Sequence, residues 1–288
     1  MKPERGSGVD IQRKPEWLRK KITPGDQSKM RQLLGELRLN TVCQQALCPN
    51  ISECFACGQA TFLIMGKSCT RLCSFCNVEK SAPVPVDLDE PARVAGAVAG
   101  LKLSHVVVTS PTRDDLQDGG ASLFAATVTA IRCSSPDTRI ELLIPDFKGD
   151  VPSLESVVAS RPDIIAHNLE TVKRLYRVRG GADYGRSLEV LRLCAEMAPD
   201  IRTKSGIMLG MGEQEEEVLN VFRDLRRVGC AYLSVGQYLA PSRRHYPVQE
   251  YARPELFESL RLRALEMGFG HVESAPYVRS SYHAARYA

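Results

Sequence analysis

The stretch Gly66-Lys67-Ser68-Cys69-Thr70-Arg71-Leu72-Cys73-Ser74-Phe75-Cys76-Asn77 places three cysteines within eight residues. Thiolates spaced so closely can converge on one cluster only if the chain wraps around it as a loop. Three thiolates on a four-iron cubane leave one iron without a protein ligand, and an open iron can take part in chemistry. The aromatic Phe75, directly before the last cysteine, is suited to lining a cofactor held there.

A second cysteine triplet with a different spacing precedes this loop, in Thr41-Val42-Cys43-Gln44-Gln45-Ala46-Leu47-Cys48-Pro49-Asn50-Ile51-Ser52-Glu53-Cys54. Four thiolates usually make an electron-transfer or structural cluster, whereas a triplet indicates reactivity. Two triplets therefore predict one cluster for activation and another for a second task. Zinc is the alternative ligand, but structural zinc favours paired Cys-x2-Cys units and four ligands.

The composition is that of a single globular domain. The chain has 288 residues, of which 43% are hydrophobic, enough for one sizeable barrel core. Its net charge of +4 is too weak to indicate nucleic acid, although a local basic face could receive an acidic protein partner. We expect a cytoplasmic protein without membrane spans, because no apolar run approaches the ~20 residues that cross a bilayer. Ten cysteines without an apparent signal peptide favour a reducing compartment over disulfides.

Apolar segments of strand length alternate with segments of helical period along the chain. The expected strands are residues 61–65, 105–109, 140–144, 163–166, 205–209 and 232–236, and expected helices include residues 188–197, 213–228 and 256–267. Alternation repeated six times predicts a parallel sheet with crossover helices, either an open doubly wound sheet or a barrel. The pattern alone does not separate these two folds.

Polar residues follow the apolar part of several expected strands. In a barrel such positions lie at the C-terminal mouth, where active sites collect. The candidate cofactor contacts are Thr109, Ser110, Asp114, Asn168, Glu170 and Lys204, and Asp146, His167, Gln237 and Tyr238 occupy similar positions. A polar strand end could instead satisfy backbone groups, and Asp114, Glu170 and Lys204 are equally suited to be buried charge partners.

The Cys-x3-Cys-x2-Cys loop with its aromatic residue resembles the signature of radical S-adenosylmethionine enzymes. The earlier triplet resembles the auxiliary-cluster motif of the lipoyl synthase family. Further segments similar to that family are residues 113–121, 144–150, 167–171, 236–239, 241–245 and 278–284. The resemblance runs from about Lys14 to the C-terminus and so covers nearly the whole chain. It implies an α/β fold, a partial (β/α)6 TIM-type barrel that is open on one side.

The resemblance also implies how the chain is organised. It predicts an N-terminal extension carrying the auxiliary cluster motif (residues 1–58), a radical S-adenosylmethionine barrel (residues 59–270) and a short C-terminal extension (residues 271–288). The implied cofactors are S-adenosylmethionine and two [4Fe-4S] clusters. Their implied ligands are Cys69, Cys73 and Cys76 for one cluster, and Cys43, Cys48, Cys54 and a serine for the other.

Two adjacent serines near the C-terminus are the candidates for that oxygen ligand. By composition alone, Ser280 and Ser281 would be capping or surface hydroxyls. In the lipoyl synthase family a serine of an Arg-Ser-Ser-Tyr motif ligates the fourth iron, and the motif here is Arg279 to Tyr282. Matched to that motif, Ser281 is the favoured ligand, although the chemistry of two adjacent serines does not separate it from Ser280. A serine suits this role because an alkoxide on iron can be protonated and lost more easily than a buried thiolate can be replaced. Arg279, if near the cluster, could hold anionic intermediates.

The activity implied by the resemblance is that of a sulfurtransferase of the radical type. It would insert sulfur at C6 and C8 of a protein-bound octanoyl chain, using two S-adenosylmethionine molecules and sulfur from the auxiliary cluster. The implied partners are octanoylated carriers (glycine-cleavage H protein or 2-oxoacid dehydrogenase acyltransferase subunits), a reductant such as ferredoxin or flavodoxin, and an iron-sulfur carrier for cluster repair. Basic residues that could help dock the carrier are Arg13, Lys14, Arg19 and Lys20.

Two other functions remain open from the residues. In the first, the earlier triplet is an electron relay and the reaction is methylthiolation or another oxidation. Cys57 would then supply a fourth thiolate, although we expect it to be a small buried thiol, like Cys133, Cys194 and Cys230. In the second, both triplets are structural metal sites of a binding module, which would have no need of six strand-helix repeats.

Overall fold

The computed structural model describes residues 14–19 and 27–287, and its centre is one sheet of eight strands in the order β1 to β8. The strands are β1 (Asn40–Thr41), β2 (Thr61–Leu63), β3 (His105–Thr109), β4 (Arg139–Leu143), β5 (Ile164–Ala166), β6 (Arg202–Leu209), β7 (Tyr232–Gln237) and β8 (His271–Ser274). The pair β1–β2 is antiparallel, and every later pair is parallel. In the described residues β1 and β8 end the order without pairing to each other, so the barrel is open.

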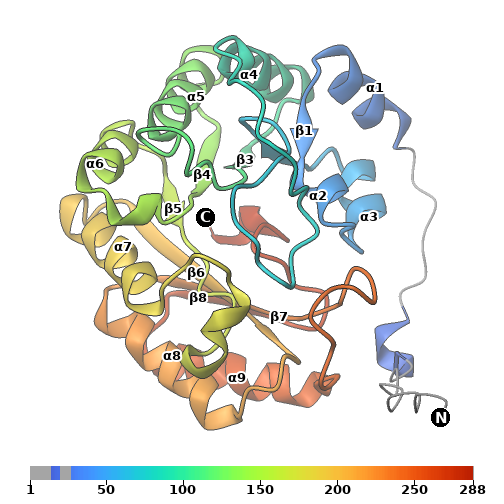
Figure 1. Ribbon diagram of the computed structural model, residues 1–288. Coiled ribbons are helices and arrows are strands. Elements are labelled where there is room, and N and C mark those ends of the chain that lie inside the picture. The colour runs from blue at the N-terminus through green and yellow to red at the C-terminus, as the bar shows by residue number, and fades with distance from the viewer. Residues whose placement is uncertain (1–13, 20–26, 288) are drawn as a thin grey trace, which may run out of the picture.

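Helices cover the outside of this curved sheet (Figure 1). The α-helices are α1 (Ser28–Glu36), α2 (Val42–Gln45), α3 (Ile51–Ala56), α4 (Glu90–Leu101), α5 (Ala121–Ser134), α6 (Val151–Ala159), α7 (Tyr184–Met197), α8 (Glu215–Arg227) and α9 (Pro254–Glu266). Short 3-10 helices are η1 (Glu16–Leu18), η2 (Phe147–Gly149), η3 (Lys173–Val178) and η4 (Ala284–Tyr287). Each strand from β2 to β7 is followed by one of α4 to α9, which confirms the partial (β/α)6 barrel. Within the described residues, none of the helices combines the length and the apolar character that crossing a membrane requires.

Local sequence signals set several helix starts. The Asp183 side chain caps α7 by accepting a hydrogen bond from the backbone N–H of Arg186, so this helix begins before the expected residue 188. Gln214 and Glu217 form a capping box at the start of α8. The six expected strands are confirmed to within a few residues. The pattern missed β1, which has two residues, and β8, whose four residues include a single apolar one, Val272.

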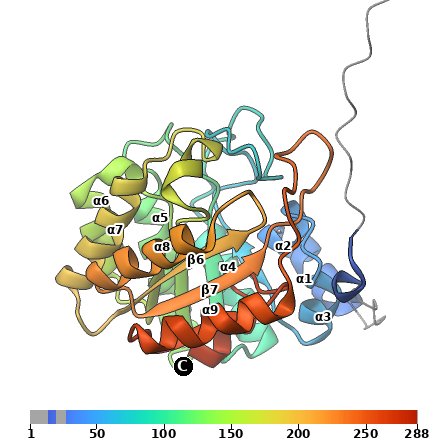
Figure 2. The ribbon, with the colours of Figure 1, turned by 90° about the horizontal axis from the view of Figure 1, so that it is seen from below.

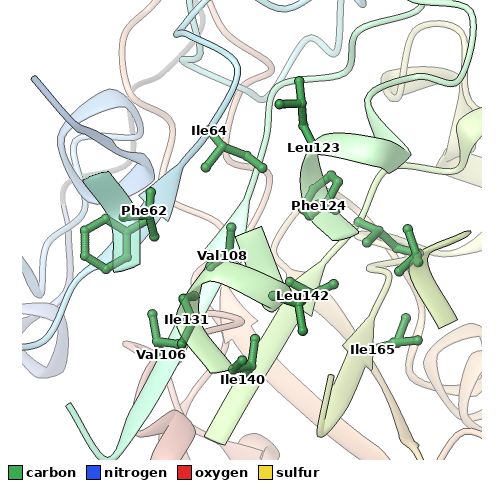
Figure 3. Close-up of a cluster of buried hydrophobic side chains, with 14 of the residues drawn as sticks. Phe62, Ile64, Val106, Val108, Leu123, Phe124, Ile131, Ile140, Leu142 and Ile165 are labelled. Carbon is green, nitrogen blue, oxygen red and sulfur yellow. The ribbon is translucent and has the colours of Figure 1, made fainter. Parts of the chain in front are cut away.

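The hydrophobic core lies between the sheet and its helices (Figure 3). Alternate strand residues face outward, and Phe62, Val106, Val108, Ile140 and Leu142 are essentially inaccessible to solvent. They pack in one cluster with helix residues that include Phe124 and Ile131 of α5. The intervening strand residues face the barrel interior, where buried polar side chains such as Thr109, Glu141 and Lys204 lie beside apolar ones such as Val107.

A buried ion pair fills the barrel interior near the beginning of the strands. The Lys204 Nζ donates to both carboxylate oxygens of Glu141, at 3.0 and 3.1 Å, and both side chains are fully buried. The ring of Tyr287 lies 3.6 Å from the Lys204 Nζ, and its hydroxyl donates to the carbonyl of Leu233. The C-terminus thus ends inside the ring of strands (Figure 1), and in the turned view it lies at the lower side of the molecule (Figure 2).

This placement corrects one expectation about Lys204. The prediction of a cofactor contact at the barrel mouth is wrong for this residue, because it lies three residues into β6 and its ammonium is enclosed by Glu141 and Tyr287. Lys204 is a buried charge partner, the alternative that the sequence left open.

We predict that Lys204→Met lowers the free energy of unfolding by about 3–5 kcal/mol, because it leaves the buried Glu141 carboxylate without its cation. The double variant Glu141→Leu/Lys204→Met should recover most of that loss, since it leaves no unpaired charge. Urea unfolding followed by circular dichroism measures both. If Lys204→Met were as stable as the wild type, the ion pair of Lys204 and Glu141 would contribute nothing to the stability of the fold.

Candidate active site

The loop that carries the second cysteine triplet is fixed to the barrel mouth by Arg71. Its guanidinium donates to Asp114 at 2.8 and 3.0 Å and to Asp146, just beyond the end of β4, at 2.6 and 2.9 Å. Arg186 of α7 donates to the same Asp146 carboxylate at 2.7 Å. Arg71 holds the pKa of Asp146 well below its usual range, against the effect of burial. This charge cluster therefore positions the loop, and Asp114 is a charge partner of Arg71.

The earlier triplet is presented by two short helices and the turn between them. Cys43 lies in α2, which the Thr41 side chain caps, Cys48 lies in the turn, and Cys54 lies in α3. The buried Asn50 amide donates to the carbonyl of Tyr277, 227 residues later, at 2.8 Å. The amide of Asn77 donates at 2.8 Å to the carbonyl of Gln45, which joins the two triplet loops.

The two adjacent serines face different parts of the site. Thr61, the first residue of β2, donates from its hydroxyl to the Ser281 Oγ at 2.6 Å. Burial raises the pKa of the Cys43 thiol, and its contact with the neighbouring Thr61 opposes part of that rise. The Ser280 hydroxyl instead donates to the Asn168 Oδ1 at 3.1 Å. Ser281 therefore lies on the side of the first triplet, and Ser280 on the side of strand β5.

A cavity of about 400 Å³, here called the main cavity, lies between the two triplet loops. Its polar lining comes from both triplets, from the end of β5 and from the C-terminal segment: Cys43, Cys48, Cys76, Asn168, Glu170, Arg279, Ser280 and Ser281. Apolar side chains such as Phe75, Leu143 and Ile207 line it as well. Thr109, Ser110 and Asp114 do not line it, and the Thr109 hydroxyl donates to the carbonyl of Leu143.

Asn168 and Glu170 form a polar patch on the wall of the main cavity. The Asn168 amide donates to the Glu170 carboxylate at 3.1 Å, and burial raises the pKa of Glu170. The backbone of Glu170 pairs with β6 and has a φ of 67°, which turns the chain after Asn168. A Cβ at Gly206 would lie 2.5 Å from the Ser234 Oγ and 3.0 Å from the Asn168 Oδ1, so a larger residue there would displace these side chains. The patch offers oxygen acceptors to an ammonium group or a sugar hydroxyl.

His167, which precedes Asn168, belongs to a directed chain of hydrogen bonds. Arg179 donates to the Tyr176 hydroxyl at 2.5 Å, Tyr176 to Ser187 at 2.6 Å, and Ser187 lies 3.0 Å from the His167 Nε2. The other ring nitrogen of His167 lies 2.9 Å from the carbonyl of Ile144. Burial and the positive charge of Arg179 lower the pKa of His167 to about 4. A neutral imidazole fits this chain, with Nδ1–H donating to Ile144 and Nε2 accepting from Ser187.

The donor groups of both triplets fit iron-sulfur clusters. None of the ten cysteines forms a disulfide. Within residues 14–19 and 27–287, no three metal-binding side chains lie close enough together to hold one metal ion. A cubane spreads its thiolates more widely than one ion does, so this spacing does not oppose a cluster. Burial raises the pKa of Cys73 to about 11, so iron binding would displace the thiol proton.

The sequence reasoning missed Thr61, Arg71 and the Arg179 chain, and it misjudged two thiols. Arg71 lies inside the second triplet loop, so its charge could have been noticed in the sequence. Its partner Asp146 is 75 residues away, and no local pattern indicates that pairing. Cys57 and Cys133 are exposed, contrary to expectation, because Cys57 is the C-terminal cap of α3 and Cys133 is the penultimate residue of α5. Cys194 and Cys230 are buried as expected.

Comparison with known proteins gives concordant similarities. The Radical SAM superfamily profile matches residues 63–225. A protein named lipoyl synthase from Trichlorobacter lovleyi is 67% identical over 281 residues, which are 97% of this chain and 100% of the relative. Proteins of the same name from Geobacter metallireducens and Alkaliphilus metalliredigens are 66% and 53% identical over 279 residues, which cover 97% and 96% of this chain and 99% and 96% of the relatives.

Solved structures resemble the fold. Methylornithine synthase aligns with a TM-score of 0.55 at 15% identity, covering 73% of this chain and 69% of that one. Streptococcus suis SuiB bound to S-adenosylmethionine aligns with a TM-score of 0.59 at 11% identity, covering 78% of this chain and 54% of that one. At these identities the likeness concerns the fold alone, and it agrees with the partial TIM-type barrel.

We predict that Asp146→Asn weakens the anchor of the second triplet loop. Arg71 would lose charge-assisted hydrogen bonds, each worth about 1.5–3 kcal/mol, and the loop cysteines would be held less firmly. After anaerobic reconstitution with iron and sulfide, the iron content per chain should fall below that of the wild type. Asp115→Asn is the matched control, because Asp115 pairs with Arg113 outside the anchor. Equal iron content in all three proteins would contradict the anchoring role.

His167 should make the folded state sensitive to acid. Its pKa is about 4 when folded and about 6.5 when unfolded, so protons favour the unfolded chain. The contribution to stability is fully present above pH 6.5 and is lost as pH falls towards 4, by about 2 kcal/mol at pH 5. His167→Gln, which does not titrate, should narrow its stability gap to the wild type by that amount. Urea unfolding of metal-free protein at pH 7 and pH 5 measures this, and a gap that does not change with pH would refute it.

Proposed function

Since the chain belongs to the lipoyl synthase family of the radical S-adenosylmethionine superfamily, we propose that its two cysteine triplets serve one reaction at the main cavity. The enzyme is a sulfurtransferase that inserts two sulfur atoms at C6 and C8 of a protein-bound octanoyl-lysine and so makes the lipoyl group. Its cofactors are two [4Fe-4S] clusters and S-adenosylmethionine, one molecule for each insertion.

One observation supports separate roles for the two clusters: residues of both cysteine triplets line the main cavity. When bound, the cluster at Cys69, Cys73 and Cys76 and its S-adenosylmethionine supply the radical that removes hydrogen from an unactivated carbon, and the auxiliary cluster supplies the sulfur. Cys76 of the second triplet lines this cavity together with Cys43 and Cys48 of the first. The apolar walls between them suit an alkyl chain and keep water away from a reactive carbon.

The polar residues of the cavity then take separate roles. Asn168 and Glu170 would hold polar groups of S-adenosylmethionine, since their oxygens face the cavity beside the second triplet loop. Ser281 would complete the auxiliary cluster, because it lines the cavity with Cys43 and shares Thr61 with it. Arg279 would favour an anionic cluster there. Ser280 would orient Asn168 and is the alternative ligand.

The three predicted segments find support in contacts between the ends of the chain. The extension that carries the auxiliary motif (residues 1–58) and the C-terminal extension (residues 271–288) meet through Asn50 and Tyr277. The barrel between them (residues 59–270) carries the second triplet. A docking role for the N-terminal basic residues remains a proposal. Arg13 and Lys20 lie outside the described residues, whereas Lys14 is exposed at the rim of the main cavity and Arg19 is exposed.

The substrates are octanoylated carrier proteins, as lipoyl synthesis requires. Glycine-cleavage H protein and the acyltransferase subunits of 2-oxoacid dehydrogenases are the proposed carriers. A ferredoxin or flavodoxin is the proposed electron donor, and an iron-sulfur carrier the proposed source of cluster repair. We also place the enzyme in a reducing compartment such as the cytoplasm, because its ten cysteines are free thiols.

Mass spectrometry of an octanoyl-lysine peptide tests the function directly. After anaerobic incubation with reconstituted enzyme, S-adenosylmethionine and a strong reductant, we expect a gain of two sulfurs, a loss of two hydrogens, and 5′-deoxyadenosine. Deoxyadenosine with an unmodified peptide would reject this substrate.

The ligand role of Ser281 has its own test in the same assay. Ser281→Cys should abolish double insertion, because a thiolate is displaced from iron less easily than an alkoxide. Ser280→Ala is the matched control and should keep at least part of the activity. Full double insertion by Ser281→Cys would refute the role. Ser280 would be the ligand instead if Ser280→Ala alone lost sulfur insertion and still released 5′-deoxyadenosine at the wild-type rate.

A further inference from the structure

A turn that follows β7 presents two arginines beside the main cavity. The residues directly after β7, residues 238–241, line that cavity. The backbone N–H of His245 donates to the carbonyl of Ser242 at 3.1 Å, so Arg243 and Arg244 occupy the two central positions of a turn. Both arginine side chains are exposed. Two positive charges therefore lie in solvent next to the mouth of the cavity.

Hydrogen bonds fix the position of this turn. The Ser242 Oγ lies 2.9 Å from the His245 Nδ1 within it. Directly after the turn, the backbone N–H of Tyr246 donates at 2.9 Å to the carbonyl of Ser74, which belongs to the second triplet loop. The hydroxyl of Tyr238 donates to the carbonyl of Tyr246 at 2.7 Å. The two arginines are therefore held beside the loop that carries the second triplet.

Two lysines add positive charge at the same mouth. Lys14 is exposed and lines the main cavity. Lys80 is exposed as well. Burial raises the pKa of the Cys76 thiol, and the positive charge of Lys80 opposes part of that rise, so Lys80 lies near the part of the cavity lining that Cys76 forms. These four residues, Lys14, Lys80, Arg243 and Arg244, are here called the basic rim.

The charges of the basic rim are not compensated by the protein itself. Among the residues that the structure describes, none of its four members forms an ion pair. The described lining of the main cavity contains one carboxylate, Glu170, which accepts a hydrogen bond from Asn168. Arginines on the outer helices are instead neutralised by neighbouring carboxylates, as in the pairs Arg192–Glu189, Arg223–Glu216 and Arg261–Glu258. Uncompensated positive charge at a cavity mouth favours an acidic partner.

An exposed apolar side chain lies at the same mouth. Leu47, in the turn between α2 and α3, is 64% exposed and lines the main cavity. The carbonyl of Gln45, two residues earlier, accepts a hydrogen bond from Asn77 at 2.8 Å, so this turn lies beside the second triplet loop. Protein interfaces commonly place apolar contacts inside a polar border. The mouth therefore has the composition of a surface that binds another protein.

We propose that the basic rim docks the octanoylated carrier through an acidic surface that surrounds the carrier's modified lysine. The inference rests on the proposed function, which requires the acyl chain of a carrier to enter the main cavity. An octanoyl-lysine is a single side chain, so the surface around it must contact the mouth when C6 and C8 are inside the cavity. Carboxylates of that surface pair with Arg243 and Arg244, and Leu47 contacts apolar side chains beside the lysine.

The test compares a folded carrier with a short peptide. Fluorescence anisotropy of labelled, octanoylated glycine-cleavage H protein gives its Kd for full-length reconstituted enzyme, measured anaerobically without reductant. Mass spectrometry gives the rate of sulfur insertion into an uncharged octanoyl-lysine tripeptide. Arg243→Glu/Arg244→Glu should raise the Kd of the carrier roughly tenfold, the low end of what charge complementarity contributes to association. The same variant should modify the tripeptide at the wild-type rate, because the tripeptide has no acidic surface to dock.

Two controls separate docking from damage to the fold. Arg202→Glu reverses an exposed charge at the first residue of β6, which lies at the opposite end of the barrel from the mouth, and should leave the Kd unchanged. In a second carrier, the carboxylates nearest to the octanoyl-lysine are replaced by lysine. This carrier should bind Arg243→Glu/Arg244→Glu more tightly than it binds the wild type, a recovery that a misfolded enzyme could not show.

Three results would overturn the proposal. The first is an unchanged carrier Kd in Arg243→Glu/Arg244→Glu, and the second is an equal loss of tripeptide modification, which would place the arginines in the reaction itself. In the third, the carrier Kd is unchanged while 5′-deoxyadenosine forms more slowly with flavodoxin but not with a chemical reductant. The rim would then dock the electron donor. A wild type that modifies neither tripeptide nor carrier would refute the proposed function, whereas the Kd, measured without turnover, still tests the docking.

Discussion

A sheet that stops short of closing must be completed by other parts of the chain, and the organisation of this enzyme depends on that constraint. The sheet ends at β1 and β8 without closing, and the C-terminal segment enters the barrel interior. A Cβ at Gly236 would collide with the carbonyl of Val278, so glycine alone lets the C-terminal segment lie against β7. The same segment reaches Thr61 through Ser281 and ends with Tyr287 inside the ring of strands. One stretch therefore packs against β7, lines the main cavity through Ser281 and enters the interior of the open barrel.

Positive charge accompanies each proposed cluster. Arg71 lies inside the second triplet loop. Burial raises the pKa of the Cys73 thiol, and the positive charge of Arg179 opposes part of that rise. Arg279 and Lys102 stand beside the first triplet. The carboxylates of Asp114 and Asp146 bind Arg71 from the side of the barrel. The loop is therefore held by ion pairs that leave its cysteines available as ligands. The contacts that position this loop are therefore separate from its cysteines.

Much of the fold was predictable because it follows from local patterns. The six expected strands are Val-, Ile- and Leu-rich runs of the kind that parallel strands buried on both faces require. The helix starts at Asp183 and Gln214 follow from capping chemistry that is written in neighbouring residues. The sequence did not predict β8, because residues 271–274 are mostly polar and lack an apolar strand pattern. This segment forms a strand through its pairing with β7. Lys204 was misplaced because position within a strand decides which end of a barrel a charge occupies.

By itself the sequence determined the chemistry of this protein, since the spacings of Cys43, Cys48, Cys54 and Cys69, Cys73, Cys76 and the Arg-Ser-Ser-Tyr motif are local and need no fold to be read. Tertiary structure alone decided which of these residues meet. Ser281 joins Thr61 across 220 residues, and Arg71 joins Asp146 across 75. Contacts of that span arise from how the sheet curves and where it stays open, and no local pattern encodes them. The same holds for the main cavity, which exists only because the two triplet loops, the end of β5 and the C-terminal segment lie beside one another.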